Sequence, residues 1–269
     1  MEMLPVLGRH IVAGSKKQEL RPIHFLYWGH GFGWRGSKKV DLSHPDTELS
    51  AKSFTAALKN FMSVLQKNGI SESGRLDTLI FDACVMATLE NIFEFQEVAD
   101  NQVVAPSLVP ENGILFSTLP ILNSSAVEFA QKNSEPPRGD WVGRRFLAIT
   151  RPQVDISLRE AVRAWVDYLR VDREKALVSY KTFEKNLRLK GGSFIGVSTL
   201  DFVSESSRIL SEVGFTRRPI PKPVFFPEVR LDLPWRIELL TEGDSILKKS
   251  QELSLARELA IYEYYKELR

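Results

Sequence analysis

Two side chains in this sequence, His30 and Cys84, have the chemistry of a base and a nucleophile. Cys84 is the only cysteine among 269 residues, and it lies 54 residues after His30. A thiolate can attack a carbonyl carbon to form a thioester, which water then hydrolyses, while a histidine moves the protons of both steps. Each residue also has a structural interpretation, because free cysteines are usually small buried side chains. Residue type alone favours the structural interpretation of Cys84, so the positions of both residues along the chain must decide.

Both residues follow an apolar run that predicts a buried strand. Residues 23–28 read IHFLYW, and residues 76–81 read LDTLIF. Ligands of open α/β sheets bind beyond the carboxyl ends of strands, so we expect both side chains at that edge. We also expect a helix over about 85–98. It would place Cys84 at a helix N-terminus, where the helix dipole favours a thiolate.

The glycines around His30 match the pattern G-x-G-x-x-G over residues 31–36. In a dinucleotide-binding site a helix opens at these glycines. Here the polar stretch 36–49 follows, with no helical periodicity. A nucleotide-binding fold is therefore the minor alternative, and we expect the glycines to let the backbone turn and approach another group closely.

Strand-like and helix-like segments alternate through the first 150 residues. A helix is expected from Ser50 to Asn68, because apolar residues recur every three or four positions within it. Alternation implies crossover connections and parallel pairing, so we predict an α/β fold with a parallel-rich sheet flanked by helices on both faces. The C-terminal half is more helical. Further strands are expected at about 101–107, 146–150 and 193–199, further helices at about 157–169, 173–188 and 244–267, and a proline-rich connector at 217–234.

The composition excludes several classes of protein. The 36 basic and 34 acidic residues leave a net charge of +2, which does not favour nucleic-acid binding. No apolar run is long enough to span a membrane, and no secretory signal is visible. One cysteine allows neither an internal disulfide nor a cysteine-based zinc site. We expect a soluble cytoplasmic protein.

The segment HFLYWGHGFGW (24–34), followed by LDTLIFDACVMATLE (76–90), resembles the clostripain-like (C11) cysteine peptidases, which share the caspase and gingipain fold. In that family one strand ends in His-Gly-x-Gly and a second in Asp-Ala-Cys-x-Met-Ala. Residues 47–58 and 103–113 are also similar to family segments. The resemblance covers about residues 23–115, and the paired motifs are more specific than either alone.

The resemblance implies roles for individual residues. His30 and Cys84 would form the catalytic dyad, and the backbone N–H groups of Gly31 and Cys84 would form the oxyanion hole. Cleavage would follow Arg or Lys, read by an acidic pocket. Asp82 is the first candidate for that acid, although a carboxylate that binds backbone amides at a helix start is an equal alternative. Glu111 is a second candidate.

We therefore expect a cysteine endopeptidase in a regulated intracellular signalling or defence role. Its partners would be a protein or peptide substrate and either an activating protease or a partner chain. The alternative is a catalytically silent caspase-fold interaction module, or one subunit of a protease complex. No cofactor is expected. Calcium is a minor option, because acidic residues cluster in a loop that is more typically solvated: Asp41, Asp46 and Glu48.

The expected organisation has three parts. Residues 1–22 would be a short N-terminal segment with a reduced or truncated first strand and helix. Residues 23–215 would form the caspase-like peptidase domain. Residues 216–269 would be the proline-rich connector and a C-terminal helix packed on that domain.

Overall fold

The computed structural model describes residues 22–35, 37–38, 48–110, 112–134, 145–189, 196–215, 218–224, 228–236, 239 and 243–269. The chain divides into two compact units. Unit 1 holds Met1–Ala87 and Asn91–Pro152, and unit 2 holds Thr88–Glu90 and Gln153–Arg269. The expected boundary near residue 215, between the peptidase domain and the C-terminal part, stays a prediction.

The main sheet of unit 1 has four strands within its described part, in the order β1-β5-β6-β7. Strands β1 (His24–Trp28), β5 (Leu76–Asp82) and β6 (Ala99–Val104) run parallel. Strand β7 (Leu147–Thr150) is antiparallel to β6, so one strand pair of the sheet departs from the parallel pairing that the alternation of strands and helices implies. The predicted class, an α/β fold with a parallel-rich sheet, is confirmed.

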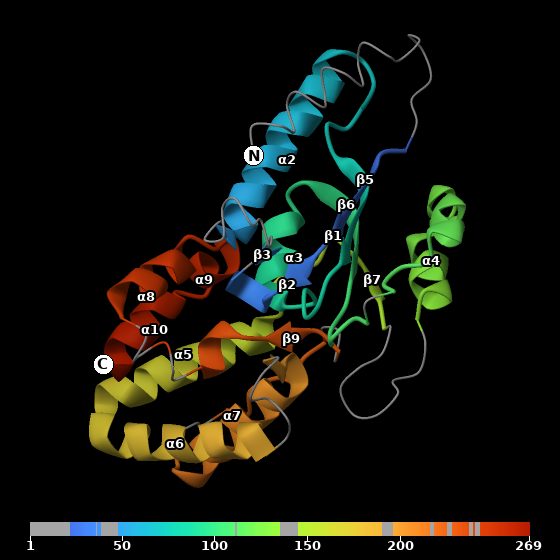
Figure 1. The fold of residues 1–269 in the computed structure, drawn as a ribbon. Coiled ribbons are helices and arrows are strands. Elements are labelled where there is room, and N and C mark those ends of the chain that lie inside the picture. The colour runs from blue at the N-terminus through green and yellow to red at the C-terminus, as the bar shows by residue number, and fades with distance from the viewer. Residues whose placement is uncertain are drawn as a thin grey trace. The chain divides into compact units, whose positions relative to one another are not determined.

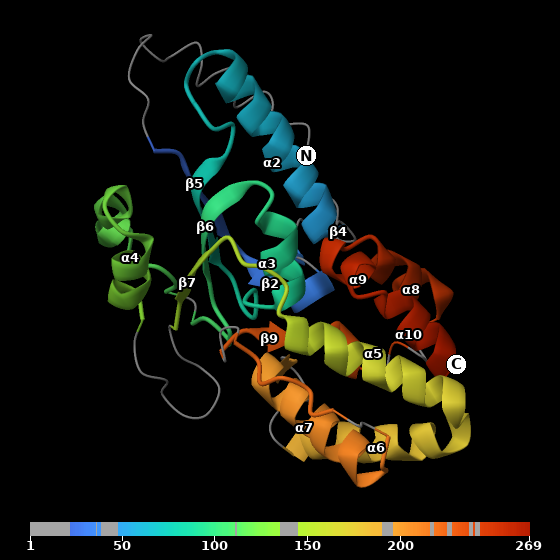
Figure 2. The ribbon, with the colours of Figure 1, turned by 180° about the vertical axis from the view of Figure 1, so that it is seen from behind.

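Helices cover both faces of this sheet, as predicted. Helices α2 (Ala51–Lys67) and α3 (Leu89–Phe95) lie on one side, and α4 (Ala126–Lys132) lies on the other with the 3₁₀ segment η2 (Phe116–Asn123) (Figure 1, Figure 2). Neighbouring residues of β5 pack on opposite faces of the sheet, because side chains alternate along a strand. Phe81 packs on Phe54 and Phe95, with ring centroids 5.7 and 4.8 Å away. Ile80 joins the apolar cluster around Phe129 on the other face.

The apolar face of α2 is the one that the sequence predicts. The Ser50 side chain caps its start by accepting the N–H of Ser53, and Asn68 ends it before Gly69 turns at φ +71°. Its buried side chains include the apolar residues that recur every three or four positions in the sequence: Phe54, Leu58, Phe61, Met62 and Leu65.

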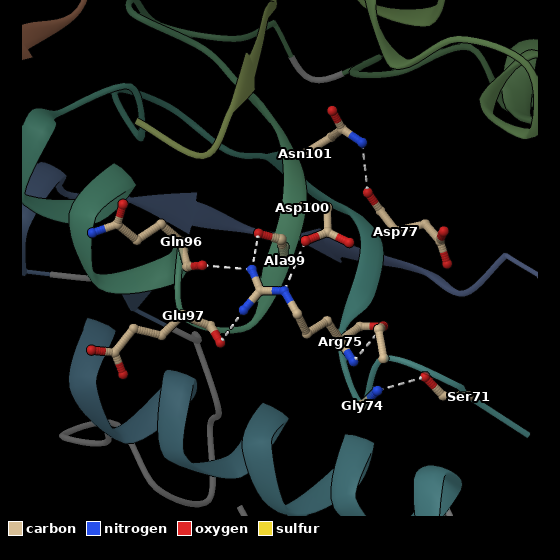
Figure 3. A network of polar contacts seen from close by, with 10 residues as sticks. Ser71, Gly74, Arg75, Asp77, Gln96, Glu97, Ala99, Asp100 and Asn101 are labelled. Carbon is tan, nitrogen blue, oxygen red and sulfur yellow. Dashed lines mark hydrogen bonds and ion pairs between the residues drawn. The ribbon is translucent and has the colours of Figure 1, made fainter. Parts of the chain in front are cut away.

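One arginine joins the start of β5 to the end of α3 (Figure 3). The Arg75 guanidinium donates to the carbonyls of Gln96, Glu97 and Ala99 at 2.6–2.8 Å, and to the Asp100 carboxylate at 2.8 Å. It therefore binds carbonyls of the turn between α3 and β6, and of the first residue of β6. The contact fixes the amino end of β5.

A small antiparallel sheet follows β1. It pairs β2 (His30–Gly31) with β3 (Ser37–Lys38), and β3 with β4 (Glu48–Leu49). Between β2 and β3, Gly33 begins a short 3₁₀ turn, η1 (Gly33–Arg35), and no α-helix opens in the described residues of this segment. A pyrophosphate site of the dinucleotide-binding type requires that helix, so this geometry does not support one.

Unit 2 is mostly helical in its described residues, as predicted for the C-terminal half. Helices α5 (Ile156–Val171), α6 (Arg173–Leu189) and α7 (Thr199–Glu212) pack around buried aromatic side chains. The Trp165 ring lies 5.4 Å from Tyr180 and 5.2 Å from Phe183. A short strand pair, β8 (Val197–Ser198) with β9 (Arg230–Leu231), completes this unit together with η3 (Leu233–Trp235).

The single C-terminal helix expected over 244–267 is wrong. The structure has three short helices instead: α8 (Asp244–Gln251), α9 (Ser254–Glu258) and α10 (Ile261–Leu268). Leu253 is extended and Ala260 is left-handed, with φ +52°, so neither can continue a right-handed helix. Within the described part of the chain, none of the helices has both the length and the apolarity needed to cross a membrane.

Candidate active site

A cavity of about 530 Å³ opens in unit 1 at the carboxyl ends of β1 and β5. Its lining comes from the ends of these two strands and from the loop after β6. The lining residues are Trp28, Gly29, His30, Asp82, Ala83, Cys84, Val109 and Pro110. The structure therefore brings His30, Asp82 and Cys84 together at the sheet edge where the sequence predicts a site.

His30 is exposed and lies on β2, one residue after the glycine that ends β1. Gly29 donates its N–H to the carbonyl of Asp82 at 3.2 Å, so the start of the histidine loop is bonded to the end of β5. The Phe32 ring lies 6.4 Å from the imidazole. His30 therefore presents its ring to the cavity from a backbone that is anchored on the neighbouring strand.

Cys84 does not stand at a helix N-terminus, which corrects the sequence expectation. It lies in a turn directly after β5, and α3 starts only at Leu89. Residues 85–87 continue instead along the segment after β6: Val85 donates to the carbonyl of Ser107 at 3.0 Å, and Ala87 donates to that of Ala105 at 2.9 Å. These bonds compete with helix formation. The helix dipole therefore provides no argument for a Cys84 thiolate.

The turn that carries Cys84 is held in a strained backbone state. Val85 has φ +49°, a region that β-branched residues rarely adopt. Such a state costs about 1–3 kcal/mol and persists where the surroundings impose it, commonly at functional sites. The half-buried thiol accepts the N–H of Val109 at 3.3 Å. The turn thus directs the sulfur into the cavity lined by Val109 and Pro110.

Gly31 brings the histidine loop against the cysteine turn. A Cβ atom at this position would lie 2.0 Å from the Cys84 carbonyl oxygen and 2.9 Å from the Met86 side chain. Only glycine fits without displacing backbone. The close approach expected from the glycines is therefore present, and its partner is the turn that carries the candidate nucleophile.

The Asp82 carboxylate is buried and lines the cavity. One oxygen, Oδ2, accepts the N–H of Ile114 at 2.9 Å. Gly113 passes so close, with φ +44°, that a Cβ there would lie 2.1 Å from this oxygen. Asp82 thus binds a backbone amide, but that amide belongs to a loop and not to the start of a helix.

Some predicted residues lie outside the described part of the chain. Glu111 is one of them, although its neighbour Pro110 lines the cavity. Asp41, Asp46 and the side chain of Glu48 are others, so calcium binding there stays untested. Among the described residues no cluster of three or more His, Cys, Asp or Glu could hold a metal ion.

Sequence reasoning missed several residues of the cavity. Trp28 is 72% exposed on its rim and pairs in register with Asp82 across β1 and β5. A tryptophan at the end of the predicted strand 23–28, two residues before His30, is the sequence feature that could have indicated it. Val109 and Pro110 come from a loop whose contact with Cys84 links residues 25 positions apart, which no local pattern reveals.

Comparison with protein-family models gives a match to the clostripain family over residues 12–181. That match spans more than half of the chain and includes both candidate motifs. No curated protein matches this chain.

Solved structures with similarity to this chain include three C11 proteases. The first, a secreted C11 cysteine protease from Bacteroides thetaiotaomicron in complex with an irreversible peptide inhibitor, is 17% identical with a TM-score of 0.40. The match covers 63% of this chain and 49% of that one, so the chain spans about half of its length. An inactive zymogen C11 protease from Parabacteroides distasonis is 14% identical, with a TM-score of 0.45 and coverage of 98% and 75%. Another secreted C11 protease from B. thetaiotaomicron, named iotapain, is 10% identical, with a TM-score of 0.47 and coverage of 100% and 77%.

Proposed function

Because this chain belongs to the clostripain family, whose members are classed as cysteine peptidases and so as hydrolases, we propose that it is a cysteine endopeptidase with a His30–Cys84 dyad. The observation that carries the proposal is that both side chains line one cavity at the carboxyl ends of β1 and β5. Family membership provides the reaction class, and the cavity provides a place where a peptide could meet both groups.

The proposed reaction has two steps. His30 takes the proton of the Cys84 thiol, the sulfur attacks the scissile carbonyl carbon, the C–N bond breaks, and His30 passes this proton to the leaving amine. Water then loses a proton to His30 and attacks the thioester, the C–S bond breaks to release the acid product, and His30 returns the proton to the Cys84 sulfur. The N–H groups of Gly31 and Cys84 would donate to the oxyanion that forms in each step. Gly31 suits this role because only a residue without a side chain lets the histidine loop lie this close to the Cys84 turn.

We further propose that cleavage follows Arg or Lys. Asp82 supports this specificity because its carboxylate is a buried acidic group in the lining of the cavity, beside the exposed Trp28 ring. A carboxylate that is shielded from water forms strong charge-assisted hydrogen bonds with a guanidinium or ammonium group. An aromatic face next to it adds a cation–π contact.

The dyad is tested with fluorogenic peptides that carry Arg, Lys or a neutral residue before the scissile bond. The wild type should hydrolyse the basic peptides, and Cys84→Ala and His30→Ala should each lose at least about a thousandfold in kcat/KM. Samples with and without prior limited proteolysis should be compared, because peptidases can require activation. Turnover that survives Cys84→Ala would contradict the proposal.

Asp82→Asn provides a matched test of specificity within the same assay. The asparagine keeps an oxygen that can accept the Ile114 N–H but removes the charge. We expect the preference for basic over neutral peptides to fall by about tenfold or more, mainly through KM. An unchanged preference would show that Asp82 only holds the loop at Ile114.

An intracellular, regulated role is part of the proposal. A chain with one cysteine can form no internal disulfide, which suits a reducing compartment. Fractionation of cells that express the full protein tests the compartment, and recovery of the activity outside the cells would contradict it. The interaction-module alternative predicts a folded chain without turnover before and after limited proteolysis.

A further inference from the structure

The side chain of Asn91 lies where the histidine loop and the cysteine turn come together. It is fully buried in α3. Its Nδ2 atom donates to the carbonyl of Gly33 at 2.8 Å and contacts the carbonyl of Met86 at 3.4 Å. Gly33 lies three residues after His30, and Met86 lies two residues after Cys84. One amide group therefore bonds to both segments that carry the candidate dyad.

The chemistry of this position requires a donor with two hydrogens. Both neighbours are carbonyl oxygens, which only accept, and a primary amide offers two N–H bonds from one nitrogen. An apolar residue would leave both buried carbonyls without this donor, at a cost typical of unsatisfied buried groups. Aspartate has almost the same shape but would direct a second acceptor at the two carbonyls.

Gly31 and Asn91 act on the two segments in complementary ways. Contact of Gly31 with the Cys84 carbonyl limits how closely the two backbones approach. The Asn91 bonds limit how far they separate. Reactive groups must be held within about half an ångström of the productive geometry to react efficiently.

From these contacts we propose that Asn91 is a positioning residue that sets the distance and orientation of the His30 ring relative to the Cys84 sulfur. The inference rests on the catalytic roles proposed above for these two residues. Asn91 itself does not line the cavity, so it acts through the backbone of the two loops.

The inference can be tested without a substrate, because Cys84 is the only thiol in the chain. The rate at which iodoacetamide alkylates Cys84 is followed by mass spectrometry in the wild type, Asn91→Asp and His30→Ala. Asn91→Asp should slow alkylation about tenfold, towards the rate of His30→Ala, because the histidine no longer lies correctly beside the thiol. Asn91→Ala, which introduces no buried charge, should give the same direction of change.

A double-mutant cycle separates positioning from a general structural defect. If Asn91 acts through the pairing of His30 with Cys84, Asn91→Asp should change the rate by less than about twofold in a His30→Ala background. If Asn91 has only a general structural role, Asn91→Asp should slow alkylation in the His30→Ala background as much as it does in the wild type. Gln102→Glu is the matched control, because Gln102 is a buried amide that donates to the carbonyl of Ile92 at 2.9 Å. This control should stay within about twofold of the wild type.

Peptide turnover gives the second readout. For Asn91→Asp and Asn91→Ala, kcat should fall about ten- to hundredfold while KM stays within about twofold. The inference is overturned if both variants alkylate and turn over like Gln102→Glu, or if the alkylation defect is equally large without His30. If the wild type cleaves no peptide but the cycle is non-additive, the positioning role stands and the proposed peptidase fails. If peptides are cleaved and the cycle is additive, the proposed peptidase stands and the positioning role fails.

Discussion

At the scale of single residues, Gly31 is the described glycine at which an added Cβ atom would make the shortest contact. Its missing side chain is what allows the histidine loop to contact the Cys84 carbonyl, and a Cβ atom would lie 2.0 Å from that oxygen. We predict that Gly31→Ala forces the two loops apart. It should lower kcat/KM by about a hundredfold and the free energy of unfolding by about 1–3 kcal/mol.

Gly69→Ala is the control for this substitution. Gly69 has φ +71°, and a Cβ atom there would have nothing within 4 Å. This variant should lose about 1 kcal/mol through backbone strain alone and keep its peptide turnover. Peptide kinetics together with urea unfolding of both variants measure the two effects. Equal activity of Gly31→Ala and Gly69→Ala would refute the steric argument.

The sequence reveals the rare residue types of the site but not their local backbone. His30 and Cys84 could be placed at one sheet edge because each follows an apolar run. The turn at Cys84 could not be predicted, since Val85 bonds to Ser107 and takes a φ that its own type disfavours. Asn91 was missed for the same reason, because its partners lie 58 and five residues away.

At the scale of elements, Arg75 anchors β5 at the end that is remote from the site. Its guanidinium donates to three backbone carbonyls and to the Asp100 carboxylate (Figure 3). Lysine keeps the charge but cannot reproduce this fork of donors. We predict that Arg75→Lys lowers the free energy of unfolding by about 1–3 kcal/mol.

Activity provides a separate check on this role. Arg75 precedes β5 and Asp82 ends it, so the seven-residue strand separates them by about 20 Å. The folded fraction of Arg75→Lys should therefore turn peptides over at the wild-type rate. Arg163→Lys is the control, because Arg163 is exposed and forms only an i,i+3 pair with Glu160, so its stability should change by less than about 0.5 kcal/mol. Urea titrations that give the two variants equal stability would contradict the prediction.

Helices with a strong apolar periodicity could be predicted from the sequence. The direction of a strand that follows a long connection could not. The face of α2 follows directly from the spacing of its apolar residues. The antiparallel direction of β7 depends on where a connection of more than 40 residues returns, and no local pattern contains that information. The breaks between α8, α9 and α10 depend on the conformations of Leu253 and Ala260, two residues with high helix propensity.

At the scale of the whole molecule, unit 2 contains a buried acid that should make stability depend on pH. The Glu90 Oε1 atom accepts the N–H groups of Asp232 and Leu233 at 2.9 and 2.8 Å. Burial, and to a smaller extent the nearby Asp232 carboxylate, raise the pKa of Glu90 from 4.5 to about 7, although the backbone bonds oppose this. Arg236, which pairs with Asp232, and the buried Tyr265 hydroxyl are the other ionisable groups beside this acid.

The sign of the effect follows from the raised pKa. The folded state holds the proton of Glu90 more tightly than the unfolded state does. The stability gained from this proton is complete below pH 4.5 and is lost as the pH rises through about 7. The loss amounts to about 3 kcal/mol across that window. Other groups that titrate in this range change the stability of the wild type and of a Glu90 variant by the same amount. The difference in stability between the two proteins therefore reports on Glu90.

Glu90→Gln should therefore flatten this part of the curve of stability against pH. The glutamine keeps an oxygen for the Asp232 and Leu233 amides but cannot ionise. Its amide nitrogen would take the place of Oε2, which has no hydrogen-bond partner among the described residues, so absolute stability is not the readout. Urea unfolding of both proteins at several values between pH 4.5 and 8 gives the difference directly. It should change by about 3 kcal/mol in favour of Glu90→Gln as the pH rises. Parallel curves would mean that Glu90 stays ionised in the folded protein and that its two backbone bonds outweigh its burial.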